Sequence, residues 1–257
     1  MQLRGLADLA HHPPRGRGGT LWAISIALAA STAIAAPARA DRGDVTGELS
    51  LAPASQRGAP PVRDLGFVPR AQNPLKPVEP YDPRPYLVVV LEGGAGSDRA
   101  DRLSYAIEGA TFAAPVLPVQ AGVPFEIANR SGHAPRLYVE GAPEVLAGEP
   151  LNPRGSLGAT VPTPYRAFAI RDRESAHIEA AVVAFPHPYF SRVDDDGRFQ
   201  IEGVPVGTYS ARLWYRDGWL DIQPERVTVR SDGRARVQLA IPPRLEVTVP
   251  DSDGAPE

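Results

Sequence analysis

The chain has 257 residues and a formal net charge of −3 at pH 7, with 27 basic and 30 acidic residues interspersed. A mildly acidic chain of this kind lacks the basic surface that nucleic acids require, so we expect no nucleic-acid partner. It contains no Cys, and Met1 is its single methionine, which excludes disulfides and sulfur ligands from the mature protein. Its 29 Pro and 24 Gly residues, together about a fifth of the chain, predict an all-β protein with many turns.

The first 40 residues have the pattern of an export signal. A basic leader, an apolar segment and a small-x-small cleavage motif follow one another: Arg4, Arg15 and Arg17, then residues 21–36, then residues 38–40. A membrane anchor is the alternative, but the apolar segment is shorter than the roughly 20 residues that a spanning helix needs. We expect cleavage after Ala40, a periplasmic or secreted mature protein, and no membrane span after cleavage.

Residues 41–85 are predicted to form an N-terminal strand and a Pro-rich linker. Residues 44–51 alternate between apolar and polar side chains, which is typical of a half-buried strand. Residues 52–85 contain prolines throughout and can form neither a ladder nor a helix. We expect an exposed, semi-extended linker, with a peptide-docking arm or a spacer as the alternative.

Short apolar runs predict a first β-sandwich over residues 86–182. The strongest candidate for a buried strand is residues 86–91, with the sequence YLVVVL. Further strands are predicted at residues 105–112, 116–119, 123–128, 135–139, 165–170 and 178–185. Residues 142–164, with Pro and Gly throughout, are predicted to be a long loop. No segment shows sustained helical periodicity, so we expect a Greek-key sandwich.

A second sandwich is predicted over residues 183–245. An apolar run leads to an acidic turn at residues 194–197, and alternating strands follow at residues 198–201 and 208–215. Two more strands are predicted at residues 221–230 and 235–241. The remaining residues, 246–257, are expected to be a disordered tail.

Residues 194–214 carry the pattern DxDGxFxIxxVPxGxYxxxxW, preceded by His-Pro-Tyr-Phe at residues 187–190. This pattern resembles the carboxypeptidase-regulatory, transthyretin-like β-sandwich module of secreted proteins. The resemblance implies an accessory fold without peptidase residues, and it implies a packing role for His187 at a domain junction. In a group of bacterial extracytoplasmic proteins, this module follows a cupredoxin-like, plastocyanin-type domain.

Residues 112–129 resemble the cupredoxin pattern F-x-P-x-x-x-V-x-x-G-x-x-V-x-F-x-N, which precedes the first histidine ligand, and His133 follows here. The resemblance implies a second ligand loop, C-x-x-H-x-x-M, at Asp172, Ser175 and Ile178. The thiolate, the second imidazole and the thioether are therefore missing. Because a type 1 copper centre needs the thiolate, we expect no such centre and no other cofactor.

A metal site without sulfur is the main alternative. His133, Asp172 and His177 could together hold Zn or Cu(II), because imidazole and carboxylate groups bind both ions. We favour the simpler interpretation that both histidines lie in loops or at strand ends. The acidic turn does not predict calcium, because the twelfth position of an EF-hand loop, which needs Glu, is Pro205 here.

Trp214 and Trp219 flank a short polar turn. Alternation places Trp214 and Tyr215 on opposite faces of their strand, so we expect one tryptophan in the core and the other capping a loop. The alternative is an exposed aromatic platform that binds a sugar or a partner protein. The chain has neither G-x-S-x-G nor H-E-x-x-H, and we expect no enzymatic activity.

These observations predict an exported, non-enzymatic binding or structural protein of the periplasm or cell envelope. Its partner would be an envelope protein or a glycan. Two alternatives remain: a Cu- or Zn-handling protein that uses His133, Asp172 and His177, and an envelope carbohydrate- or peptide-binding module that uses Trp214 and Trp219.

Overall fold

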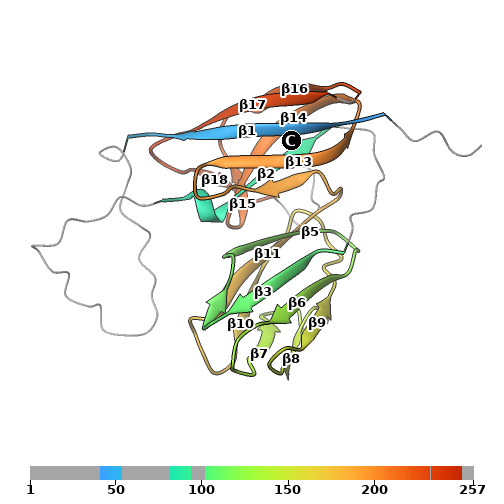
Figure 1. Ribbon diagram of the computed structural model, residues 1–257. Coiled ribbons are helices and arrows are strands. Elements are labelled where there is room, and N and C mark those ends of the chain that lie inside the picture. Colours follow the sequence, from blue (N-terminus) through green and yellow to red (C-terminus); the bar gives the residue numbers. More distant parts are fainter. Residues whose placement is uncertain (1–40, 54–81, 94–101, 232, 251–257) are drawn as a thin grey trace, which may run out of the picture. The chain divides into compact units, whose positions relative to one another are not determined.

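A computed structural model describes residues 41–53, 82–93, 102–231 and 233–250 (Figure 1). All of them belong to one compact unit, residues Arg39–Glu257. Strands dominate, and the one helix in the described ranges is the 3-10 turn η2 (Arg84–Tyr86), which confirms the all-β prediction. The predicted signal and most of the Pro-rich linker lie outside the described residues. No helix among the described residues is long and apolar enough to cross a membrane.

The strands form two β-sandwiches. The first sandwich contains β3 (Ser104–Glu108), β4 (Thr111–Phe112), β5 (Val116–Gln120), β6 (Phe125–Asn129), β7 (Arg136–Val139), β8 (Ala147–Pro150), β9 (Ser156–Ala159), β10 (Ala167–Asp172) and β11 (Glu179–Phe185). The second sandwich contains β1 (Arg42–Leu51), β2 (Leu87–Glu92), β12 (Phe190–Arg192), β13 (Arg198–Pro205), β14 (Gly207–Tyr215), β15 (Gly218–Leu220), β16 (Glu225–Val229), β17 (Arg234–Ile241) and β18 (Val247–Thr248).

The first sandwich consists of the sheets β4-β3-β6-β9 and β5-β11-β10-β7-β8. Their alternating side chains enclose one hydrophobic core, to which Phe125, Leu137 and Ile170 contribute. The predicted long loop at residues 142–164 is wrong in part, because β8 and β9 lie within it and pair with β7 and β6. Both are four-residue strands at sheet edges, where pairing with a neighbour rather than a local pattern defines the strand.

The second sandwich consists of the sheet β13-β1-β17 and the sheet β12-β2-β14-β15-β18, with β16 also paired to β14. The strand β1 lies between two partners far along the chain, antiparallel to β13 and parallel to β17. Val45 and Leu49 point into the core. Gly47 lies between them, and a side chain there would collide with the ring of Phe199. The absence of a Cβ therefore lets Phe199 fill the core beneath β1.

The strand β2 belongs to the second sandwich, although the sequence led us to place residues 86–91 in the first. It pairs antiparallel with both β12 and β14. Every residue from Leu87 to Leu91 is fully buried, so both faces of the strand are covered. A continuous apolar run of this kind predicts burial but cannot indicate which sheet the strand joins. The strands β1 and β2 lie in different sheets of this sandwich and do not pair with each other.

Residues from both sandwiches form a third hydrophobic cluster, which we call the junction core. Its buried members are Val88, Val90, Trp214 and Trp219 from the second sandwich, and Val116, Val183 and Phe185 from the first. The strand β11 pairs with β10 and β5 along its length, so the predicted boundary between residues 182 and 183 would cut it. The predicted tail is also partly ordered, because β18 pairs with β15.

Candidate functional site

The loops that carry the predicted metal-binding residues lie at one end of the first sandwich. His133 lies between β6 and β7, Asp172 ends β10, and His177 lies between β10 and β11. The pairing of β7 with β10 places Leu137 opposite Asp172 and so brings these loops together. A backbone hydrogen bond of 3.2 Å from the N–H of Arg173 to the carbonyl of Arg136 joins the two loops.

A buried asparagine fixes the backbone at the first of these loops. The Nδ2 of Asn129 donates to the carbonyls of His133 and Leu151, at 2.6 and 2.7 Å. Its Oδ1 accepts from both the N–H and the hydroxyl of Ser131, at 2.9 and 2.6 Å. All four hydrogen-bonding positions of the amide are therefore used. No role was predicted for Asn129, although a polar residue at the end of an apolar strand is a sequence signal for one.

The carboxylate of Asp172 stabilises the backbone of the neighbouring loop. Asp172 is 7% exposed, and its Oδ1 accepts a hydrogen bond of 2.5 Å from the N–H of Arg136. The side chains of His133 and His177 are exposed. Across the described residues, no group of three or more His, Cys, Asp or Glu side chains could hold a metal ion. The fold thus brings the three predicted residues to one end without forming such a group.

A polar network connects the two sandwiches beside the junction core. Tyr165 precedes β10, and its hydroxyl donates to Oε1 of Glu92 at the end of β2, at 2.7 Å. The other carboxylate oxygen of Glu92 lies 3.4 Å from Nη1 of Arg212 on β14. The guanidinium of Arg212 lies over the ring of Trp219, 4.2 Å from its centroid. Burial and the hydrogen bond to Glu92 both raise the pKa of Tyr165, so the phenol stays protonated and donates.

The two tryptophans lie inside the molecule. Trp214 is 0% exposed and Trp219 is 3% exposed, and they are paired across the hairpin between β14 and β15. As alternation predicted, Trp214 and Tyr215 lie on opposite faces, in the junction core and in the core of the second sandwich. The expectations of an exposed platform and of a loop-capping tryptophan are wrong. Both rings face the first sandwich because cross-strand partners share a face.

His187 lies in the short connection between β11 and β12. Its ring is stacked on Tyr189, with centroids 5.5 Å apart. Neither ring nitrogen has a hydrogen-bond partner among the described residues. Burial lowers the pKa of His187, with Glu92 acting in the opposite direction. This environment fits the packing role that the resemblance implied.

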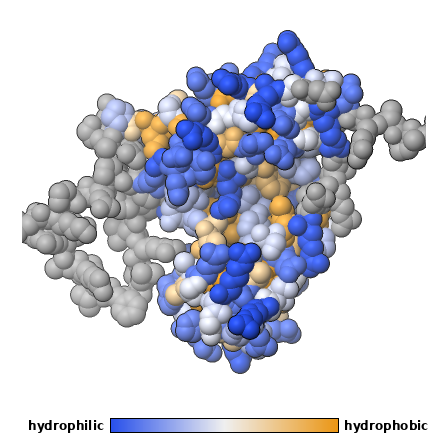
Figure 2. All heavy atoms as spheres, in the orientation of Figure 1, coloured by the Kyte–Doolittle hydropathy of each residue, from blue (hydrophilic) through white to orange (hydrophobic). Residues whose placement is uncertain are grey.

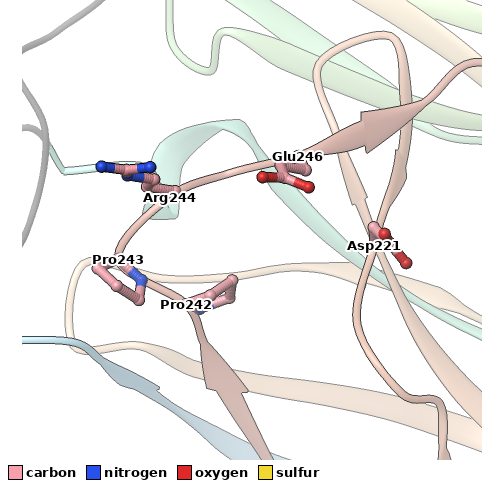
Figure 3. Close-up of a pocket in the computed structure, with 5 residues that line it drawn as sticks. All are labelled: Asp221, Pro242, Pro243, Arg244 and Glu246. Carbon is pink, nitrogen blue, oxygen red and sulfur yellow. The ribbon is translucent and has the colours of Figure 1, made fainter.

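The second sandwich carries a polar groove of about 990 Å³ over the sheet β13-β1-β17, with side chains from β12 and β16 at its rims. In Figure 2, hydrophilic colours predominate over β1, β13 and β17. A smaller hollow of about 320 Å³ lies where the chain turns from β17 to β18. Figure 3 shows its lining residues, Asp221, Pro242, Pro243, Arg244 and Glu246, whose charged groups do not converge on one point.

No family model and no curated protein matches the chain. Its structure is weakly similar to that of amicyanin over about a third of its length. Amicyanin from Paracoccus versutus is 14% identical, and the alignment covers 34% of this chain and 84% of the amicyanin chain, with a TM-score of 0.30. The oxidized form of an amicyanin mutant is 15% identical, with 37% and 97% covered and a TM-score of 0.29. Lac15 from a marine microbial metagenome is 12% identical, with 59% and 73% covered and a TM-score of 0.24.

Proposed function

We propose that the chain is an exported, non-enzymatic binding or structural protein of the periplasm or cell envelope. Its first sandwich would be a cupredoxin-like domain without a type 1 copper centre, and its second a transthyretin-like module. One observation carries the proposal. Asp172, at the position where the resemblance places the thiolate ligand, uses its carboxylate to accept the N–H of Arg136.

The chemistry of a type 1 centre explains why this observation matters. Such a centre requires a thiolate with two imidazoles, and the mature chain has no sulfur. A buried carboxylate that is committed to a backbone N–H has a structural task, because its removal would leave that N–H without a partner. Asn129 has a similar task at the adjacent loop. These contacts support a role in which the loop end is fixed rather than reactive.

Residues of the transthyretin-like pattern at positions 194–214 also have structural roles, which supports a module without catalytic chemistry. The Oδ1 of Asp194 accepts the N–H groups of Asp196 and Arg198, at 3.0 and 2.7 Å, and so closes the hairpin turn. Gly197 has a φ of 83°, a conformation that favours glycine. The hydroxyl of Tyr209 donates to the carbonyl of Pro205 at 2.9 Å. The acidic turn therefore uses Asp194 for the backbone rather than for calcium.

Calorimetric titration of the mature protein, residues 41–257, with Cu(II), Cu(I) and Zn(II) tests the proposal. We expect no stoichiometric, tight binding of any of the three ions. Two variants extend the test: His133→Ala and His177→Ala each remove one imidazole of the metal-handling alternative. Stoichiometric copper binding that His133→Ala abolishes would overturn the proposal and favour the metal-handling alternative.

A further inference from the structure

The first sandwich is an insertion between two paired strands of the second. The strand β2 precedes it in the chain and β12 follows it, and these two strands pair with each other. The chain therefore crosses between the sandwiches twice, after β2 and in the connection between β11 and β12. Each sandwich has its own hydrophobic core, and the two cores share no residue. Domains with separate cores can move relative to each other while both stay folded.

The second crossing is short and stiff, and it carries His187. It consists of residues 186–189, in which a proline on each side of His187 fixes its own φ and leaves few backbone rotations. The carbonyl of Pro186 accepts a hydrogen bond of 3.4 Å from Nε2 of Gln120, at the end of β5 in the first sandwich. The ring of His187 stacks on Tyr189, a member of the second core. The imidazole thus lies on the backbone path that joins the two sandwiches.

The surroundings of His187 suit its neutral form. The residue is half-buried, but both ring nitrogens are buried, and neither has a hydrogen-bond partner among the described residues. The neutral ring leaves one donor without an acceptor, whereas protonation would leave two donors and a charge, at a higher cost. Burial lowers the pKa of His187, and Glu92 at the end of β2, the charged group that acts on the ring, only partly opposes this.

Glu92 already holds a contact between the sandwiches. Its Oε1 accepts the hydroxyl of Tyr165 from the first sandwich at 2.7 Å, and its Oε2 lies 3.4 Å from Nη1 of Arg212. Tyr165 has a φ of 57°, which costs free energy for a residue other than glycine, so this contact is held against backbone strain. A protonated His187 would either turn its ring to water or compete with Tyr165 for Glu92. Both outcomes weaken the junction.

We propose that the junction is a pH-sensitive latch, in which protonation of His187 releases the first sandwich from the second while both stay folded. At neutral pH, the uncharged ring packs on Tyr189, and Glu92 holds Tyr165. In the released state the imidazole is hydrated and binds a proton more readily than in the closed state. Proton uptake as the pH falls below 6.5 therefore favours release. The latch goes beyond the proposed function and holds whether or not the first sandwich binds copper.

Tryptophan fluorescence tests the proposal, because Trp214 and Trp219 are the only tryptophans in residues 41–257 and both belong to the junction core. The emission spectrum and its quenching by acrylamide would be followed from pH 7 to about pH 5, with far-UV circular dichroism on the same samples. As the pH falls, we expect the emission to shift to longer wavelength and the quenching to increase, because release exposes both rings. The circular dichroism should not change, because both sandwiches stay folded.

Variants of His187 separate the latch from other effects of acid. His187→Gln cannot take up the proton and should keep its pH 7 emission at pH 5, whereas the charged His187→Lys should show the released emission already at pH 7. His177→Gln, which removes an exposed imidazole of the first sandwich, should respond as the wild type does. Three results would overturn the proposal: a wild-type emission that acid leaves unchanged, one that changes only together with the circular dichroism, or a shift that persists in His187→Gln. The first two need only the wild type, so the test stands even where a variant fails to fold.

Discussion

The loop end of the first sandwich and the junction between the sandwiches use their side chains in opposite ways. At the loop end, His133 and His177 are exposed, and the buried polar groups of Asn129 and Asp172 bind backbone atoms. At the junction, large aromatic rings are fully buried, and a polar network joins the two sandwiches. The comparison suggests that the first sandwich is built to be held against the second rather than to display a reactive site at its loops.

Removing the largest side chain of the junction core should have the largest effect on stability. Trp214→Ala deletes a ring that contacts Phe185 and Trp219, with centroids 5.6 and 5.1 Å away. We expect the free energy of unfolding to fall by about 3–5 kcal/mol, the usual cost of a large buried cavity. Urea denaturation measures it, and Val206→Ala, at a 49% exposed site, should change stability by less than about 0.5 kcal/mol. A small loss with Trp214→Ala would show that the sandwiches do not depend on this core.

The polar network can be tested by a double-mutant cycle. Glu92→Gln removes the charge that Tyr165 and Arg212 share and should cost about 2 kcal/mol, whereas Tyr165→Phe should cost about 1 kcal/mol. We expect the two losses to be non-additive by at least about 0.5 kcal/mol, because the residues are in contact. Tyr138→Phe is the matched control, since its hydroxyl makes no hydrogen bond with the described residues. Strict additivity would contradict the network.

A smaller effect is expected on the pH dependence of stability. Burial lowers the pKa of His187 in the folded state below its ordinary value of 6.5. The unfolded imidazole therefore takes up a proton near pH 6.5, while the folded one stays neutral to a lower pH. The free energy of unfolding should fall as the pH drops below 6.5. The contribution of His187 to this fall should end once the pH is below the pKa of His187 in the folded protein.

The difference between wild type and His187→Gln isolates that contribution from those of the carboxylates. Urea denaturation between pH 7 and pH 5 should show a shallower loss of stability for His187→Gln. His177→Gln removes an exposed imidazole and should retain the wild-type slope. Identical slopes for the wild type and His187→Gln would contradict a half-buried His187 that stays neutral in the folded protein.

Local patterns predicted much of the fold. Alternation located strands such as β1, β13 and β14, because their inward side chains pack in the apolar core and their outward side chains meet water. It did not assign β2 to a sheet, since a run buried on both faces has no alternation to follow. The edge strands β8 and β9 were missed because pairing, not sequence, defines them. Long-range pairing also explains β1, whose partners lie about 150 and 190 residues away.

The candidate sites were harder to predict. The family resemblance implied that His133 and Asp172 lie in the two ligand loops, and the fold brings these loops to one end. It could not indicate that Asp172 accepts a backbone N–H, because that contact depends on the register between β7 and β10. The burial of Trp219 was also missed, since a tryptophan beside a turn has no periodic neighbours that indicate its face. The polar groove was not predicted, because it combines residues of strands that are distant in sequence.

The metal content of the purified protein decides whether the first sandwich holds copper. Residues 41–257 would be purified from cells grown with added copper, and the bound metals would be measured by elemental analysis. We predict substoichiometric copper, no thiolate-to-copper absorption, and the same result for His133→Ala. One copper ion per chain in the wild type, lost in His133→Ala, would contradict the account.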